Sequence, residues 1–269
     1  MEQHAYRLDS VRDAVRLREA VLSNRHRAYV VSGGGYTGIE VATHLRHMPG
    51  CARDIPIVVV EKSPSIAAVL PGWMRDYVRA NLDRMGIEPV ENAEVAAIAP
   101  GSCRLSIGRV IEGAGLVWVA GVKTPAFAQE LPYGKRGQGR LAVDAFLRLD
   151  EHLFAAGDCA WVEKRGVPLR MSVQFAHAGG QRAAGNILRS LRGRPLWPFA
   201  PADPGYVIPM ANGRACGSVF GLPLRGRLPS FLHYIMCAFR TSGTRRRLTV
   251  LKGMWNFLDS GFWILDSMD

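Results

Sequence analysis

The chain has 269 residues, of which 48% are apolar and 21% are charged, a composition typical of a globular protein with one or two domains. Its net charge of +11 lies almost wholly in residues 161–269, which contain 15 Lys and Arg against 5 Asp and Glu. No zinc-finger, basic-zipper or RNA-binding motif accompanies this charge, which argues against a nucleic-acid partner. Five cysteines without a Cys-x-x-Cys pair argue against a disulfide framework and a zinc site, so no metal is expected.

Helical and strand patterns alternate through the first 120 residues. Helical spacing predicts helices over residues 8–23, 38–47 and 71–85, with Ser10 as a possible cap of the first. Short strands are predicted at residues 28–31, 57–61, 86–90, 95–99, 104–107 and 115–121. This order predicts an α/β protein with a doubly wound sheet.

Three glycines between the strand at 28–31 and the following helix fit the pattern G-x-G-x-x-G. Gly33 permits a tight turn, Gly35 lets the backbone approach a pyrophosphate, and Gly38 lets the helix pack closely on the strand. The helix N-terminus then offers N–H groups and a positive dipole end to phosphates. The segment therefore predicts dinucleotide binding.

An acidic residue, Glu61, closes the next apolar strand. A carboxylate at this place accepts hydrogen bonds from the ribose hydroxyls and repels a 2′-phosphate, so NAD(H) is expected rather than NADP(H). Lys62 follows directly and softens that preference.

The chain beyond residue 121 carries further signals. Residues 153–156 are expected to form a short buried strand that ends at Gly157-Asp158, after a loop at residues 133–140. Residues 172–192 are predicted to be helical, and residues 193–198 read as a linker.

Four segments together resemble a known family. Residues 32–40, 118–122, 153–159 and 173–180 occur in the order and spacing of the flavin-dependent pyridine-nucleotide oxidoreductases, and most closely of the type II NADH dehydrogenases (NADH:quinone oxidoreductases). The resemblance covers about residues 5–200. It implies a FAD/NAD(P)-binding fold, the cofactors NADH and FAD, and hydride transfer from NADH through FAD to a quinone-type acceptor.

The resemblance also implies roles for individual residues. The expected NADH site consists of Gly33, Gly34, Gly35, Tyr36, Gly38, Glu61 and Gly121. The expected FAD contacts are Gly157, Asp158, Gln174, Phe175 and Ala176, with Gln174 and His177 on the quinone side. Ala178 stands where the family has a second glutamine, which removes an amide near the quinone.

Glu40 is the expected catalytic residue, because the matching acid of the family lies near the contact of nicotinamide and flavin. The same carboxylate has an alternative reading. On the first turn of a helix it stabilises the N-terminal dipole end by about 0.3–1 kcal/mol and needs no catalytic role.

The family places an FAD-binding half with its own glycine fingerprint before the first helix, whereas this chain has 27 residues before Ala28 and no second fingerprint. We therefore expect a Rossmann-like NAD-binding domain, an incomplete FAD domain and a small helical C-terminal region. The expected boundaries are 1–27 for a residual helix of the FAD domain, 28–121 for the NADH domain, 122–198 for the C-terminal part of the FAD domain and 199–269 for the C-terminal region. FAD binding is expected to be weak or lost unless a partner chain supplies the missing half.

Residues 229–269 combine aromatic and apolar side chains with clustered cations, among them Arg245, Arg246 and Arg247. This pattern is typical of segments at an anionic membrane surface, and no apolar run approaches the length of a membrane span. The N-terminus lacks the features of a signal peptide. The expected location is cytoplasmic, peripheral on the inner face of the cell membrane. The alternative is a small C-terminal subdomain with a solvated basic face.

Three functions stay open from the sequence. The first is NADH:quinone oxidoreduction through FAD. The second is a non-catalytic NAD(H)-binding remnant or one subunit of a split enzyme. The third is a flavin reductase with another acceptor, such as ferredoxin, rubredoxin or sulfide.

Overall fold

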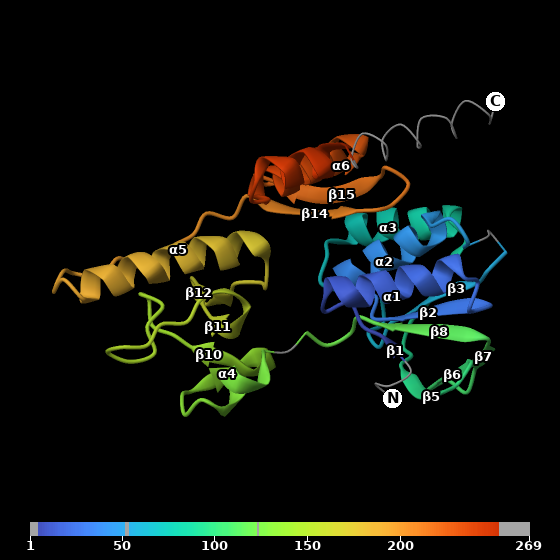
Figure 1. Cartoon of the computed structure of the whole chain (residues 1–269), viewed down its shortest axis with the longest axis horizontal. Coiled ribbons are helices and arrows are strands. Elements are labelled where there is room, and N and C mark those ends of the chain that lie inside the picture. The colour runs from blue at the N-terminus through green and yellow to red at the C-terminus, as the bar shows by residue number, and fades with distance from the viewer. Residues whose placement is uncertain (1–4, 52–53, 123, 253–269) are drawn as a thin grey trace. The chain divides into compact units, whose positions relative to one another are not determined.

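The computed structural model describes residues 5–51, 54–122 and 124–252, which fall into two compact units (Figure 1). Unit 1 contains the described residues up to Gly121 and from Gly205 onward, and unit 2 extends from Val122 to Pro204. The α/β class predicted from the sequence is confirmed. Residues 205–252 belong to the same unit as the glycine loop.

A parallel five-stranded sheet forms the centre of unit 1. Its order is β1 (Ala5–Tyr6), β8 (Ala114–Trp118), β2 (Ala28–Ser32), β3 (Ile57–Val60) and β4 (Ile87–Val90). The strands β2 and β3 are buried at every residue, as expected for apolar runs covered on both faces of a parallel sheet. In the sheet, β2 has its sequence neighbour β3 on one side and the later strand β8 on the other. The strand order therefore reverses at the carboxyl end of β2.

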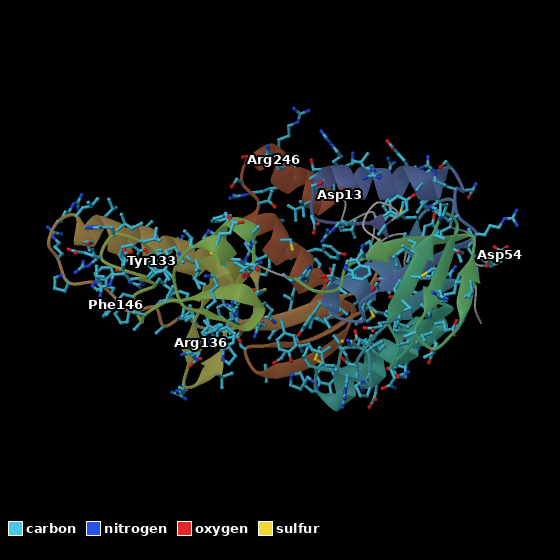
Figure 2. All side chains as sticks on the ribbon, turned by 90° about the horizontal axis from the view of Figure 1, so that it is seen from below. Asp13, Asp54, Tyr133, Arg136, Phe146 and Arg246 are labelled. Carbon is cyan, nitrogen blue, oxygen red and sulfur yellow. The ribbon has the colours of Figure 1, made fainter. Side chains whose placement is uncertain are left out.

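Three helices cover one face of this sheet: α1 (Val11–Leu22), α2 (Tyr36–His47) and α3 (Gly72–Arg84) (Figure 1). Their apolar sides pack on Tyr29, Val31 and Val59 of the sheet. The predicted cap of α1 is confirmed as a capping box. The Ser10 hydroxyl accepts a bond from the Asp13 N–H at 3.3 Å, and the Asp13 carboxylate (labelled in Figure 2) accepts one from the Ser10 N–H at 3.0 Å.

The opposite face of the sheet is covered by a small antiparallel sheet of β5 (Val95–Ala99), β6 (Ser102–Leu105) and β7 (Val110–Glu112). The strand β6 starts two residues before the predicted 104–107. The reason is a turn at Gly108, whose φ is +84° and whose N–H donates to the carbonyl of Leu105 at 3.0 Å.

The C-terminal part of unit 1 adds strands that the sequence did not predict. β14 (Gly205–Pro209), β15 (Ala215–Val219) and β16 (Leu222–Gly226) form an antiparallel meander, followed by α6 (Arg227–Arg240) and helical residues 244–252. In Figure 1 the meander lies between α6 and the helices α2 and α3. Its buried side chains Ile208, Met210 and Cys216 join the core formed by α2 and α3.

Hydrogen bonds also fasten the meander to the helices. The buried Asn81 of α3 exchanges amide bonds with Asn212, at 2.8 and 3.3 Å. The hydroxyl of Thr43 on α2 accepts a bond from the N–H of Ala211 at 3.2 Å. Buried amides and hydroxyls are stable only with such partners, so these contacts fix the meander in one position.

Unit 2 has little regular structure before its one long helix. It contains α4 (Ala126–Glu130), a small sheet of β9 (Lys135–Arg136), β10 (Arg140–Ala142) and β11 (Ala160–Trp161), a hairpin of β12 (Glu163–Lys164) and β13 (Val167–Pro168), and α5 (Val173–Ser190). Its buried apolar cluster consists of Ala128, Leu141, Ala155 and Ala160.

The predicted strand at residues 153–156 is wrong. Phe154 makes only a single bridge to Arg148, and Gly157–Cys159 is a 3₁₀ turn. An apolar run becomes a strand only when another strand pairs with it along its length, and within the described residues of unit 2 none does so here. The predicted loop at 133–140 contains the two residues of β9 and a 3₁₀ turn.

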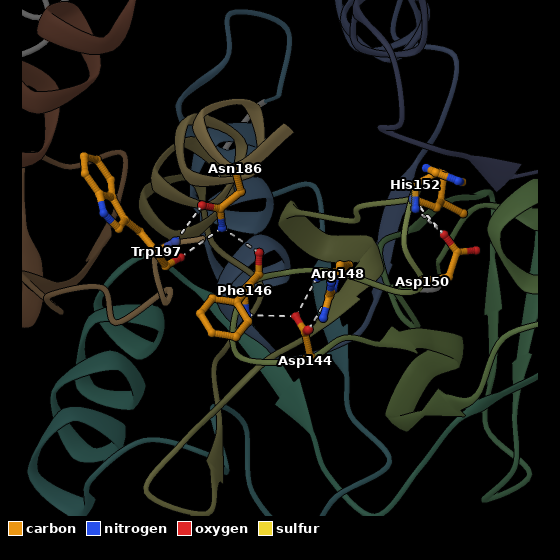
Figure 3. A network of polar contacts seen from close by, with 8 residues as sticks. Asp144, Phe146, Arg148, Asp150, His152, Asn186 and Trp197 are labelled. Carbon is orange, nitrogen blue, oxygen red and sulfur yellow. Dashed lines mark hydrogen bonds and ion pairs between the residues drawn. The ribbon is translucent and has the colours of Figure 1, made fainter. Parts of the chain in front are cut away.

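A buried asparagine fastens α5 to the preceding loop (Figure 3). The Asn186 amide donates to the carbonyls of Phe146 and Trp197, both at 2.9 Å, and accepts from the Trp197 N–H at 2.9 Å. The Asp144 carboxylate orders the same loop by accepting bonds from the N–H groups of Phe146 and Arg148, each at 2.8 Å. Because the apolar cluster of unit 2 is small, these polar contacts provide part of the stabilisation that a larger core would provide.

We expect Asn186→Ala to lower the free energy of unfolding of unit 2 by about 2–4 kcal/mol, because it leaves two carbonyls and one N–H without a partner in a buried place. Hydrogen exchange of the α5 amides measures the effect. The matched control is Gln181→Ala on the exposed side of the same helix, which we expect to change stability by about 0.5 kcal/mol or less. Equal protection of α5 in both variants would contradict the assignment.

Candidate functional site

The glycine loop joins β2 to α2 by a close approach of backbone to backbone. Gly33 has φ +115°, a region that L side chains rarely adopt. A Cβ on Gly38 would lie 1.7 Å from the carbonyl oxygen of Gly33, so only glycine lets the helix pack this closely. A Cβ on Gly33 would lie 3.2 Å from the backbone of Ala120, which follows β8. These contacts match the geometry expected of the fingerprint turn.

The outer side of the loop is open. Gly35 is exposed, and a Cβ placed on it would meet no atom within 4 Å. Gly35 is also the N-cap of α2 and provides no side-chain cap. The first N–H groups of a helix have no partner within the helix, so this end of α2 presents donors and a positive dipole end over Gly35.

Glu61 lies at the edge of the same loop. Its carboxylate accepts hydrogen bonds from the N–H groups of Gly34 at 2.7 Å and Ser63 at 2.8 Å. Burial raises the pKa of Glu61, but the hydrogen bonds from Ser63, Gly34 and Lys62 outweigh it, so the pKa is lowered and the group is charged at neutral pH. A carboxylate has about four acceptor positions, so Glu61 retains capacity for a further donor. Lys62 pairs with Glu94 at 3.0 Å.

A segment after Glu61 supports the loop through backbone hydrogen bonds that the sequence did not indicate. The N–H of Ala67 donates to the Gly34 carbonyl at 2.8 Å, and the N–H of Ile66 donates to Glu91 at 2.7 Å. The same Glu91 oxygen pairs with Arg79 of α3. Glu91 follows β4 as Glu61 follows β3, so two carboxylates lie at the same edge of the sheet. An acidic residue directly after a predicted strand, as at Glu61, is the sequence feature from which Glu91 could have been predicted.

Gly121 lies at this edge as well. Beyond β8, the N–H of Val119 donates to the Ser32 carbonyl at 3.1 Å, which holds the end of β8 beside the glycine loop. Gly121 has φ +76°, and a Cβ on it would meet no atom within 4 Å. The structure thus brings Gly33, Gly121 and Glu61 to the carboxyl edge of the sheet, at the point where the strand order reverses.

Tyr36, the first residue of α2, contacts a residue that the sequence did not indicate. Its ring lies edge-on to Tyr206 of β14, with the centroids 6.1 Å apart. Tyr206 is missing from the sequence prediction because only the folding of the meander onto α2 brings it to this place.

Glu40 lies in the second turn of α2. The helix begins at Tyr36, so the expectation of a first-turn carboxylate is wrong, and the dipole effect is weaker because it decays within the first turn. Burial raises the pKa of Glu40 to about 7. Its charge in turn raises the pKa values of Tyr234 and Cys237 on α6, after the larger effect of their own burial. The helix α6 therefore contributes to the environment of Glu40.

The expected flavin contacts lie together in unit 2. Gly157 has φ +74°, and a Cβ on it would lie 3.4 Å from the Cβ of Ala176, so the Gly157–Cys159 turn packs against the first turn of α5. Asp158 is exposed beside it, and Gln174 is half-buried. Phe175 differs from the other four. It is 7% exposed and lies under the guanidinium of Arg170 at 5.3 Å, so it packs the interior of unit 2.

Arg140 connects the two flavin segments and was not predicted from the sequence. The side chain is 5% exposed and donates to the carbonyl of Ala160 at 2.6 and 3.0 Å and to that of Leu169 at 2.9 Å. Burial lowers the pKa of Arg140, and the charge of Asp158 opposes this shift. Arg140 thus holds the strand after the Gly157 turn and the segment before α5.

On the expected quinone side, His177 is exposed, one helical turn beyond Gln174. No group of three His, Cys, Asp or Glu side chains arranged to hold a metal ion occurs among the residues that the structure describes. The five cysteines are unpaired.

Glu40 predicts a pH dependence of stability. Its pKa is raised in the folded state from 4.5 to about 7, so between these values the folded state binds more protons than the unfolded state. The free energy of unfolding therefore falls as pH rises through this window, by an amount on the order of 3 kcal/mol.

Urea unfolding at pH 4 to 8 measures this contribution. We expect Glu40→Gln to equal the parent protein below pH 4.5 and to be more stable above pH 7. The control Glu112→Gln changes an exposed carboxylate of the same unit and should leave the pH profile unchanged. Parallel profiles for the parent and Glu40→Gln would refute the raised pKa.

Comparison with known proteins places this geometry in a family. The family model described as pyridine nucleotide-disulphide oxidoreductase matches residues 1–183. The NADH dehydrogenase-like protein Rv1812c of Mycobacterium tuberculosis is 29% identical over 236 residues, which are 82% of this chain and 58% of the relative. The type II NADH:quinone oxidoreductase of Haemophilus influenzae is 26% identical and is covered to 55%, and that of Staphylococcus aureus is 25% identical and is covered to 65%. The chain thus spans 55 to 65% of the length of these relatives.

Solved structures share the fold. NDH2 from Plasmodium falciparum, solved in complex with NADH, gives a TM-score of 0.78 at 14% identity over 97% of this chain and 74% of that one. CoADR-RHD of Bacillus anthracis gives a TM-score of 0.67 at 21% identity over 80% of this chain and 38% of that one. The match of the family model over residues 1–183 shows that the chain belongs to the pyridine nucleotide-disulphide oxidoreductase family.

Proposed function

We propose that unit 1 binds NADH at the glycine loop. The observation that carries this proposal is the open backbone at Gly35, next to a helix N-terminus without a side-chain cap. A pyrophosphate over Gly35 accepts bonds from the N–H groups at the start of α2, where the helix dipole favours negative charge. Gly121 leaves space on the β8 side of the same edge.

The proposed nucleotide is NADH rather than NADPH. Glu61 is charged at neutral pH and lies where the family of this fingerprint binds the adenosine ribose. Its carboxylate accepts ribose hydroxyls and repels a 2′-phosphate. Lys62, the next residue, forms an ion pair with Glu94 at 3.0 Å. This ion pair competes with binding of Lys62 to a 2′-phosphate.

Gly35→Ala tests the NADH proposal without disturbing the fold. Gly35 has φ −78°, which alanine adopts freely, and its Cβ would meet only open space. We expect unchanged thermal unfolding and about tenfold weaker NADH binding, because the methyl group occupies the approach of the pyrophosphate. Nucleotide fluorescence measures the affinity.

The control is Gly134→Ala, the same change at an exposed position of unit 2. We expect it to leave the affinity unchanged, and NADPH to bind more weakly than NADH to every protein in the series. Equal NADH affinities for the parent and Gly35→Ala would count against the loop as the site.

We further propose that the chain is the NADH-binding part of an NADH:quinone oxidoreductase. Relatives named type II NADH:quinone oxidoreductase support this assignment. In unit 2, one surface contains Gly157, Asp158 and the first turn of α5. The exposed Asp158 carboxylate can accept a bond from a sugar hydroxyl, so this surface suits one edge of FAD. Bound FAD supplies the two-electron chemistry that connects a hydride donor to a quinone. We propose that a partner chain provides further contacts to FAD.

Glu40 is proposed to carry a proton in this reaction. A carboxyl with a pKa of about 7 changes its protonation state at neutral pH, as proton transfer during quinone reduction requires. Gln174 and His177 are proposed to lie towards the quinone, with Gln174 also near the flavin.

Flavin uptake tests this part of the proposal. We expect a mixture of this chain, FAD and the protein encoded immediately upstream to acquire the flavin absorption band, which NADH then bleaches. Asp158→Ala should reduce the retained flavin, whereas Glu151→Ala, an exposed acid elsewhere in unit 2, should not. A colourless mixture that still binds NADH would contradict the two-chain enzyme and favour a non-catalytic NAD(H)-binding protein.

We propose that residues 229–269 bind an anionic membrane surface at the cytoplasmic inner face of the cell membrane. Within the described part, Phe231 and Phe239 of α6 and Leu248 are exposed, the last two at 72% and 61%. Arg245, Arg246 and Arg247, which directly precede Leu248, are also exposed, and Arg246 projects from the ribbon in Figure 2. Aromatic side chains next to cations suit the boundary between lipid headgroups and acyl chains. Trp255, Phe257, Phe262, Trp263 and Ile264 lie outside the described residues.

Helices of the described residues are too short or too polar to cross a bilayer.

Vesicle sedimentation tests the membrane proposal. We expect replacement of Arg245, Arg246 and Arg247 by Gln to weaken binding to anionic vesicles by about 100-fold, at about 1 kcal/mol for each cation. The control replaces Arg12, Arg16 and Arg18, three exposed arginines of α1, by Gln. Equal losses in both triple variants would show a dependence on net charge alone and would overturn the assignment to this segment.

A further inference from the structure

A cavity of unit 1 lies at the opposite edge of the sheet from the glycine loop. It has a volume of about 360 Å³ and lies among the starts of β1 and β8, the end of α1, and the turn after β5. Its lining includes Tyr6, Arg16, Glu19, Arg25, His26 and residues 98–100. Because β2 and β8 are parallel, this edge and the nucleotide edge are separated by the length of the strands, so the cavity is not part of the NADH site.

His26 lines the cavity and packs closely against its neighbours. The imidazole lies so close to β8 that a Cβ on Gly115 would be 2.6 Å from its Cδ2 atom. The Nε2 atom is 2.8 Å from the hydroxyl of Tyr6, and the rings of Tyr6 and Tyr29 stand edge-on to the imidazole at 5.6 and 5.7 Å. Burial, followed by the charge of Arg25, lowers the pKa of His26, so the imidazole is neutral at neutral pH. A neutral ring held from three sides presents a fixed polar surface.

Two cations also line the cavity. Arg16 comes from α1 and Arg25 from the turn before β2, and within the described residues neither side chain has an ion pair or a hydrogen bond. The one acid among the lining residues is Glu19. Guanidinium groups bind carboxylates and phosphates with two parallel hydrogen bonds, and two of them around one cavity favour an anion.

Another part of the lining is apolar and is formed by Ile98, Ala99 and Pro100. A volume of about 360 Å³ is at the lower end of the range of ligand sites, so it suits a small molecule rather than a dinucleotide.

We propose that this cavity binds a small molecule with an apolar body and one oxyanion, either a carboxylate or a phosphate monoester. The oxyanion contacts Arg16 and Arg25, and the apolar body packs against Ile98 and Pro100. Glu19 limits the affinity by repelling the anion.

Calorimetric titration of the full chain with two probes tests the proposal. Benzoate and phenyl phosphate share a ring and differ in the anionic group, so the tighter of the two identifies the head group. Benzyl alcohol has a similar body without the charge and should not bind. We expect Arg16→Ala and Arg25→Ala each to weaken the binding of the preferred probe about tenfold, and Glu19→Gln to tighten it.

The matched control is Arg18→Ala, which removes an exposed cation of the same helix that does not line the cavity. We expect it to leave both the probe and NADH affinities unchanged, and the variants of the cavity to leave the NADH affinity unchanged. Absence of binding by both anions, benzyl alcohol binding as tightly as benzoate, or equal losses in Arg18→Ala and Arg16→Ala would overturn the proposal. Arg25→Lys keeps the charge and should retain part of the affinity.

Discussion

The structure of unit 1 depends on the approach of α2 to the end of β2. Because Gly38 has no side chain, the first turn of the helix passes directly over the Gly33 carbonyl, where a Cβ would lie 1.7 Å away. This contact sets the distance between helix and sheet, and it determines which residues of α2 enter the core. It also points the start of the helix over Gly35, so the same constraint that packs the helix exposes its N–H donors. The support from Glu61 and Ala67 keeps the loop in that position.

The helices α2 and α3 are covered on two sides, which is why the C-terminal part of the chain matters for the candidate site. The sheet lies below them, and the meander lies above, anchored by Ile208, Met210 and the amide pair of Asn81 and Asn212. The helix α6 packs on the meander, and its Tyr234 is close enough to Glu40 for the charge of Glu40 to raise the pKa of Tyr234. The same charge raises the pKa of Cys237, so C-terminal residues belong to the surroundings of this carboxyl, although Glu40 itself lies on the nucleotide-binding helix.

Unit 2 is held by a different balance of interactions. Its apolar cluster is small, and two buried polar side chains, Arg140 and Asn186, connect its segments through backbone carbonyls. Such bonds are directional, so they fix the positions of a turn and a helix even where little apolar surface is buried. They place Gly157 beside Ala176 and leave Asp158 exposed at the same surface. This arrangement supports the proposed flavin contacts while leaving Phe175 in the interior.

Much of the fold was predictable because its signals are local. The helical spacing of residues 8–23 and 71–85 and the apolar runs at 28–31 and 57–61 identify elements that the structure confirms. The geometry of the glycine loop was predictable for the same reason, since one short segment contains its strand, turn and helix.

Contacts between distant segments were not predictable in this way. The strand expected at 153–156 is absent because pairing requires a neighbour that local periodicity does not supply. Glu91 under the loop, Tyr206 beside Tyr36 and the burial of Glu40 all depend on where the chain returns. The sequence by itself determined the helices and strands next to the glycine loop and the turn that exposes Gly35. Only the tertiary structure decided which side chains surround that turn, because burial and pKa depend on residues that folding brings together from far along the chain.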